Sequence, residues 1–141
     1  MYFKKYFHAI RYLLVVSTEF KQLSKQQQTK FLAGSNAWEF ARWSDQFKQE
    51  TQVPMRHALL FFLFPDNFER MVSLSHKREI VADLSTELTP SQLKSFFEMG
   101  GFDSLLSIDQ TIFAIRKQLE EKYGTVDLDF YRPPIDGSWG V

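Results

Sequence analysis

Apolar side chains recur at steps of three and four residues along almost the whole chain, which is the spacing of one face of an α-helix. The segment from Ile108 to Tyr123 follows this spacing most regularly, and Gly124 ends it. Alternating strand patterns are lacking, apart from one short candidate at residues 125–131. The sequence therefore predicts an all-α fold: a single orthogonal bundle of about six or seven helices over residues 1–126, followed by an extended C-terminal tail over residues 127–141. Near the N-terminus a similar stripe is made of Phe3, Phe7, Ile10 and Leu14.

Start and stop signals place the helices of the first half. Ser24 is suited to cap a helix that ends at Gly34, where a left-handed glycine is expected. Pro54 suits the first turn of the next helix, because its missing N–H is not needed there. That helix is apolar all round over residues 58–64, so we expect it to be wholly buried at the centre of the domain. Pro65 then ends it.

Further signals place the helices of the second half. Asp66 and Glu69 are spaced like a capping box, which predicts a short helical turn. Ser75 is expected to cap the helix after it. Residues 89–92, Thr-Pro-Ser-Gln, form a clearer start signal, with the capping threonine, the proline and the glutamine in their preferred positions. Gly100-Gly101 is expected to end that helix.

Composition limits the class of protein. The chain has 141 residues, of which 44% are hydrophobic, and its 17 basic and 17 acidic residues balance. A neutral chain is atypical of a free-standing nucleic-acid-binding domain. Cysteine is absent, which favours a reducing cytoplasm. The longest uncharged apolar run, Ala58–Phe64, is far shorter than the roughly 20 residues of a membrane span, so no membrane association is expected.

The residue patterns of common catalytic sites are not met, so we expect no catalytic residue, cofactor or metal site. Gly100-Gly101 lacks the lysine and serine or threonine of a phosphate-binding loop. Residues 65–66 and 120–122 resemble the motif of a magnesium-dependent nuclease, but the second part lies on the most helical segment. An unrecognised hydrolase centred on Asp66 and Glu69 remains an alternative. The histidines lack metal-ligand spacing; they are His8, His57 and His76.

One basic cluster is the best candidate for contact with nucleic acid. At a helix N-terminus such side chains and the free N–H groups together suit a phosphate. This reading competes with a simple solvated surface, or with ion pairs to Glu69 and Glu79. The candidate nucleic-acid-binding residues are Arg70, His76, Lys77 and Arg78, with Arg56 near in sequence.

Two groups of residues also carry a resemblance to a known family. The first is Leu59, Leu60, Phe64, Pro65, Asp66, Phe68, Glu69, His76, Lys77, Arg78, Ile80 and Val81. The second is Asp109, Ile115, Arg116, Leu119, Tyr123, Gly124, Phe130, Tyr131, Pro134 and Trp139. In this order and spacing they resemble the helical region that precedes the AAA+ motor of McrB-type, 5-methylcytosine-specific restriction proteins. The resemblance covers roughly residues 30–139.

The resemblance implies a role in modification-dependent DNA restriction or defence. In McrB-type proteins this region looks like a connector between target recognition and motor. The present sequence stops about where the motor would begin, so nucleotide hydrolysis is not implied for it. We therefore expect a non-catalytic adaptor with a motor or nuclease subunit as its protein partner. The alternative is an accessory domain that contacts DNA through the basic cluster, and the oligomeric state stays open.

Overall fold

The structure is a computed structural model that describes residues 2–141, except for the side chains of residues 2, 3 and 5. It confirms the all-α fold, and residues 2–141 contain no strand. Short 3-10 turns link several of the helices. The α-helices are α1 (Tyr2–Gln22), α2 (Lys25–Leu32), α3 (Ala37–Ser44), α4 (Val53–Leu63), α5 (Leu74–Leu84), α6 (Pro90–Glu98) and α7 (Leu105–Tyr123).

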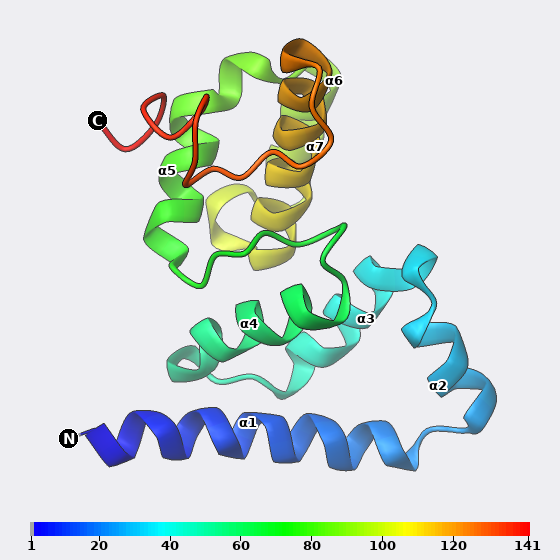
Figure 1. Cartoon of the computed structure of the whole chain (residues 1–141). Coiled ribbons are helices and arrows are strands. Elements are labelled where there is room, and N and C mark those ends of the chain that lie inside the picture. The colour runs from blue at the N-terminus through cyan, green and yellow to red at the C-terminus, as the bar shows by residue number, and fades with distance from the viewer. Residues whose placement is uncertain (1) are drawn as a thin grey trace.

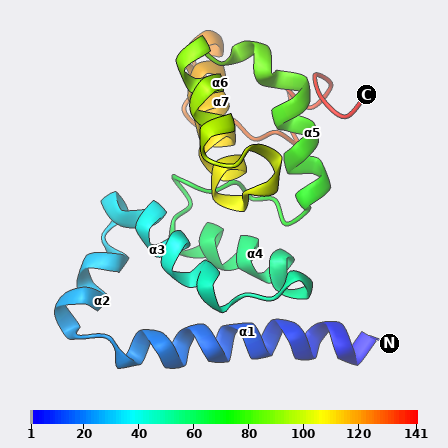
Figure 2. The same ribbon diagram turned by 180° about the vertical axis from the view of Figure 1, so that it is seen from behind.

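The helices form two groups that meet along α4. The long helix α1 runs along one side of the molecule, and α4 lies between it and the group formed by α5, α6 and α7 (Figure 1). The view from behind shows α1, α4 and the second group stacked in the same order, with α2 beyond the C-terminal end of α1 and α3 between α2 and α4 (Figure 2). The chain therefore crosses from the first group to the second once, through the loop that follows α4.

Each group has its own hydrophobic core. In the first core Tyr12 of α1, Phe40 of α3 and Leu60 of α4 are buried together. Its aromatic rings meet edge to face, as do Phe31 and Phe40, whose ring centroids lie 6.0 Å apart at 86°. In the second core Ile112 and its neighbours on α7 pack against α5. The fold thus divides its apolar interior between an aromatic core and an aliphatic one.

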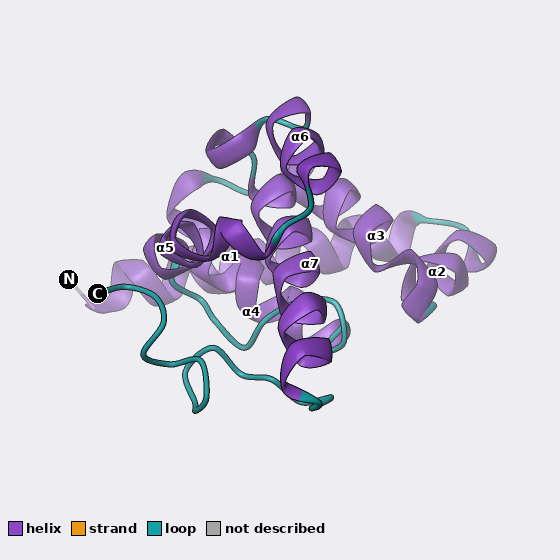
Figure 3. Ribbon diagram, turned by 90° about the horizontal axis from the view of Figure 1, so that it is seen from above, coloured by secondary structure: helices purple, strands orange, loops and turns teal. Residues whose placement is uncertain are grey.

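The C-terminal tail is part of the second core. It contains neither helix nor strand, but it is not extended as expected: it runs as a series of turns past α7 and α5 (Figure 3). Phe130 and Ile135 are buried among the aliphatic side chains. Trp139 Nε1 donates a hydrogen bond of 2.9 Å to the Phe130 carbonyl, and the Gly140 amide donates one of 2.8 Å to Asp83 on α5. These contacts hold the tail against the bundle.

Several predicted helix boundaries are confirmed. Ser24 accepts from the Gln27 amide at the start of α2, and Pro54 lies in the first turn of α4. Thr89 forms the capping box of α6. At the other ends, Gly100 and Gly124 have φ values of 108° and 67°, which favour glycine because a side chain would crowd the backbone there.

Other local predictions are wrong. Gly34 is not left-handed but begins a 3-10 turn. The cap of α5 is Ser73, two residues before the expected Ser75, because Ser73 Oγ reaches the His76 amide at 3.3 Å. Residues 65–70 form turns without a helix, and Glu69 pairs with Arg116 of α7 instead of capping. The capping spacing was overridden by this tertiary ion pair.

Helix α4 is central but not wholly buried, so that prediction needs correction. Leu60 is fully buried, whereas Phe62 is 80% exposed and Leu63 is also exposed. The buried side of α4 includes two polar residues, Arg56 and His57. The apolar residues 58–64 predicted burial on every side of the helix. Because α4 has neighbours on two sides only, part of this segment is exposed.

Candidate functional site

The predicted basic cluster is dispersed in the structure. Lys77 is fully buried, so it cannot reach a phosphate from this position. Arg70 is exposed and pairs with Asp129 of the tail at 2.7 Å. His76 Nδ1 lies 2.9 Å from the Tyr131 hydroxyl, and the Arg78 guanidinium reaches the Phe102 carbonyl at 3.4 Å. The four side chains therefore do not converge on one surface.

Lys77 instead belongs to a buried charge network between the two helix groups. Its ammonium donates to Asp109 Oδ1 at 2.6 Å and to His57 Nδ1 at 3.0 Å. The Arg56 guanidinium donates to Asp109 Oδ2 and, at 3.1 Å, to His57 Nδ1. We call these four residues, together with Asp45, the buried network. Helices α4, α5 and α7 each contribute to it.

Asp45 completes the charge balance of the buried network. It lies at the end of α3 and accepts two hydrogen bonds from Arg56, at 2.8 Å to Nε and 3.1 Å to Nη2. Such a bidentate ion pair orients the plane of the guanidinium group and also compensates its positive charge. The network then holds two cations and two carboxylates, which is the condition under which charges are tolerated in an interior.

The environment shifts the ionisation of several buried groups. Burial opposes charge on Asp109, but the attraction of Lys77 and Arg56 lowers the pKa of this carboxyl group. Burial also opposes charge on Arg56, but the attraction of Asp109 and Asp45 raises its pKa. Burial lowers the pKa of Lys77, against the attraction of Asp109. The carboxylate of Asp109 is thus the anion around which the network is organised.

His57 is held neutral by the same arrangement. Burial, and then the charge of Lys77, lower its pKa to about 2. Because Nδ1 accepts hydrogen bonds from two cations, the single ring proton belongs on Nε2. His57 Nε2 is buried without a hydrogen-bond partner among the described residues. A histidine in this state cannot serve as a general base near neutral pH.

A second ionic group ties the loop after α4 to α7. Arg116 donates to Glu69 at 2.6 Å and to the Asp66 carbonyl at 2.6 Å. It also lies 3.4 Å from Glu120, which pairs with Lys117 at 3.0 Å. Burial raises the pKa of Glu69 to about 7, although Arg116 opposes the shift.

These contacts engage two of the carboxylates considered for catalysis, whereas the side chain of Asp66 is exposed. Glu120, from the nuclease-like motif, and Glu69, from the hydrolase alternative, are both engaged with Arg116. Among the side chains that the structure describes, no group of three or more potential ligands is placed to hold a metal ion. Both networks form ion pairs between segments that are distant in sequence.

The most unusual surface feature is the apolar stripe of α1. Helices on a protein surface normally turn such a stripe toward the core. Among the side chains of α1 that the structure describes, Tyr12 and Val16 are buried, while Phe7, Ile10 and Leu14 are 66%, 56% and 62% exposed. The side chain of Phe3 lies outside the described part. We call the exposed residues Tyr6, Phe7, Ile10 and Leu14 the α1 stripe.

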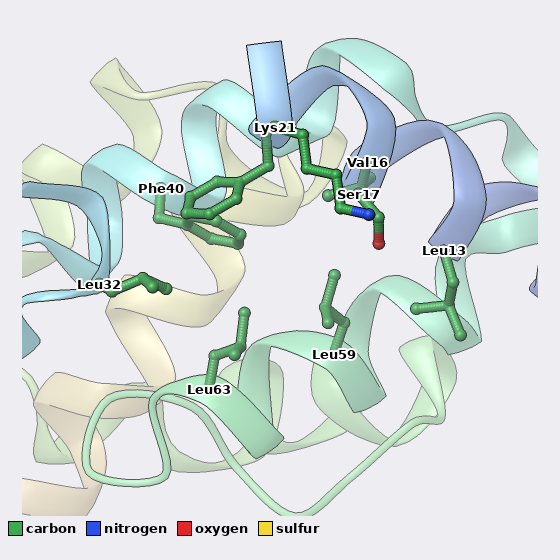
Figure 4. A pocket seen from close by; sticks show the side chains of 9 residues that line it. Leu13, Val16, Ser17, Lys21, Leu32, Phe40, Leu59 and Leu63 are labelled. Atoms are coloured by element: carbon green, nitrogen blue, oxygen red, sulfur yellow. The ribbon is translucent and has the colours of Figure 1, made fainter. Parts of the chain in front are cut away.

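An apolar groove adjoins the α1 stripe. It has a volume of about 310 Å³ and lies between α1, α2 and α4. Figure 4 shows Leu59 and Leu63 of α4, and Leu32 of α2, facing the side chains of α1 across the opening. Leu13 lines its α1 side, next in sequence to Leu14 of the stripe. The polar side chains at the groove are Ser17 and Lys21.

Two further hollows also border α4. One, of about 630 Å³, is lined by the first turns of α1 and by α4, and includes Tyr6 and Met55. The other, of about 450 Å³, lies between α4 and the loop before α5, and includes Phe62 and Val72. Both are mainly apolar. Exposed apolar side chains of α1 and α4 thus border several hollows, while others, such as Phe97 and Phe102, are exposed on the second helix group.

The chain matches no family model, and no curated protein or solved structure is significantly similar to it. None of the helices that the structure describes is long and apolar enough to cross a membrane.

Sequence reasoning missed the buried network, although part of its signal was present. Asp109, Arg116 and Glu120 are seven and four residues apart, so they form a polar row beside the apolar row of α7. Such a row next to a fully buried face indicates buried ion pairs. The partners Arg56 and Lys77 had no comparable pattern of their own.

Proposed function

We propose that the chain is a non-catalytic helical adaptor of a McrB-like modification-dependent restriction or defence system, and that it binds a motor or nuclease subunit. The observation that supports an adaptor best is the α1 stripe with its adjoining groove. Large apolar side chains exposed side by side are typical of surfaces that bind another protein. The McrB-like setting rests on the sequence resemblance.

The ionisable groups support the same proposal. Two residues with lowered pKa values, His57 and Lys77, are buried and paired with other side chains. Shifted pKa values often mark catalytic sites, but ion-pair networks produce them too. In this chain the shifted groups join α4 to α5 and α7, which is a structural task. An adaptor needs its two ends held rigidly with respect to each other.

The proposal is tested with the purified chain and a McrB-type AAA+ motor subunit. We expect the two to co-elute in size-exclusion chromatography, and the chain alone to show neither nucleotide turnover nor magnesium-dependent DNA cleavage. Complex formation should be lost in the Leu14→Ser variant and retained in Phe62→Ser, which removes an exposed side chain outside the groove. Cleavage by the chain alone that disappears in the Asp66→Asn variant would overturn the non-catalytic assignment.

The alternative function is contact with DNA through the exposed part of the basic cluster. Arg70 and Arg78 are the exposed members. The double variant Arg70→Ala/Arg78→Ala is the appropriate test, because replacing buried Lys77 would disturb the fold. DNA contact predicts a gel shift at low salt that weakens in this variant and with added salt. Absence of retardation at low salt would eliminate the alternative.

A further inference from the structure

The α1 stripe and the groove form one continuous apolar surface by helix geometry. Leu13 and Ser17 of the groove are one turn apart on α1, and so are Ile10 and Leu14 of the stripe. The two rows are neighbours, because Ile10 and Leu13, and likewise Leu14 and Ser17, are three residues apart and so adjacent on the helix surface. Across the groove, Leu32 and Leu63 are also exposed. We call this combined surface the α1 face.

The charge around the α1 face is strongly one-sided, although the whole chain is neutral. Residues 1–36, which form α1 and α2, carry six lysines and arginines and a single acid, Glu19. Residues 37–141 carry eleven basic and sixteen acidic residues. The first two helices therefore have a net charge of +5 and the rest of the chain −5. Among the basic residues, Lys21 lines the groove and Arg11 is exposed on α1.

This charge selects between the candidate occupants of the α1 face. A second copy joined through the same face would bring together two segments that each carry a net charge of +5, which opposes association. A bilayer is flat, whereas Leu32, Leu59 and Leu63 lie across a groove (Figure 4). A helix inserts apolar side chains into such a groove and can carry carboxylates on its flanks. An acidic helix matches both the concave shape of the groove and the positive charge of α1 and α2.

We propose that the α1 face binds an acidic amphipathic helix of a partner protein, an inference that rests on the proposed adaptor function. The leucines or other aliphatic residues of that helix, spaced by three and four, occupy the groove beside Leu13, Leu32 and Leu63. Its carboxylates face Lys21 and Arg11. The charge pairs at the rim accelerate encounter and determine orientation, and the apolar contacts in the groove supply most of the affinity.

The test uses a synthetic 18-residue helical peptide with leucines along one face and glutamates on the other. A matched peptide with lysines in place of the glutamates is the control for charge. Binding to the full chain is measured by fluorescence anisotropy at two salt concentrations. We expect the glutamate peptide to bind at least about tenfold more tightly than the lysine peptide, with the difference decreasing at high salt.

Variants locate the binding surface. Leu14→Ser and Leu32→Ser each remove an exposed apolar contact and should weaken binding by about tenfold. Lys21→Glu should weaken binding of the glutamate peptide and strengthen that of the lysine peptide. Phe62→Ser, which removes an equally exposed aromatic ring outside the groove, should change the affinity by less than about twofold. Unchanged thermal unfolding midpoints confirm that each variant is folded.

Four outcomes overturn the proposal. Two concern the peptides: equal binding of both, or binding of neither. The third is sedimentation of the chain with anionic phospholipid vesicles that is lost in Leu14→Ser, which would assign the face to a membrane. The fourth is dimerisation of the free chain that Leu14→Ser abolishes. If peptide binding fails while the motor subunit still co-elutes with the Leu14→Ser variant, only this surface is rejected. If the motor fails as well, the adaptor function is rejected with it.

Discussion

Lowering the pH should destabilise the protein through His57, and the structure provides the magnitude. His57 has a pKa of about 2 in the folded chain and 6.5 as its ordinary value. Between these values the unfolded chain binds a proton that the folded chain excludes. Stability is therefore complete above pH 6.5 and declines as the pH falls, by about 1.4 kcal/mol per unit. At pH 5 the loss from His57 is about 2 kcal/mol relative to pH 8.

The wild type alone does not isolate this effect, because Glu69 acts in the opposite sense. The pKa of Glu69 is raised to about 7 from an ordinary 4.5, so the folded chain binds its proton more tightly than the unfolded chain does. Its contribution is present below pH 4.5 and is lost as the pH rises through 7. Between pH 8 and pH 5 the two residues largely offset each other.

Paired variants separate the two contributions. The free energy of unfolding is measured by urea denaturation at pH 8 and pH 5 for the wild type, His57→Gln and Glu69→Gln. The destabilisation caused by His57→Gln should be smaller at pH 5 than at pH 8 by about 2 kcal/mol. That caused by Glu69→Gln should change in the other direction. A His57→Gln destabilisation that is equal at both pH values would refute the neutral, buried state of His57.

Three further predictions concern stability and are read from denaturation midpoints. Leu60→Ala should cost about 2–5 kcal/mol because it opens a cavity in the aromatic core, whereas Phe62→Ala should stay within about 0.5 kcal/mol. Asp109→Asn should cost about 3–5 kcal/mol, since it leaves two buried cations without their shared carboxylate, and a cost as small as that of Phe62→Ala would argue against the buried network. Gly124→Ala should cost about 1–2 kcal/mol, because alanine is strained in the left-handed backbone conformation of this residue. Thr89→Ala should cost about 1 kcal/mol, because the N-cap hydrogen bond of α6 is lost. An unchanged stability would reject the strain at Gly124 or the capping role of Thr89, respectively.

The parts of the fold that sequence predicts correctly depend on short-range physics. The capping box at Thr89 and the glycine at Gly124 act within one turn of helix, so neighbouring residues suffice to identify them. The buried row of α7, with Ile112 at its middle, was equally visible. The all-α fold follows from such rows, since apolar spacing by three and four recurs along the chain.

The failures depend on partners that are distant in sequence. Glu69 has the spacing of a capping residue, yet Arg116, which lies 47 positions later, binds it instead. The stripe that includes Ile10 has the spacing of an inward face, but α4 packs on the other side of α1, where Tyr12 is buried. Periodicity shows that a helix has an apolar face. It does not show which neighbour, if any, covers that face.

The buried network has a consequence for how chains of this kind can diverge. Arg56 binds two different carboxylates, and Asp109 binds two different cations, so each residue is committed to more than one other. Loss of either leaves an unbalanced charge in the interior, and neutrality returns only if a residue of the opposite sign is replaced as well, Lys77 for Asp109 or Asp45 for Arg56. We therefore expect homologous chains to keep positions 45, 56, 77 and 109 or to change them in charge-balanced pairs. Combinations that leave one unpaired buried charge should be selected against.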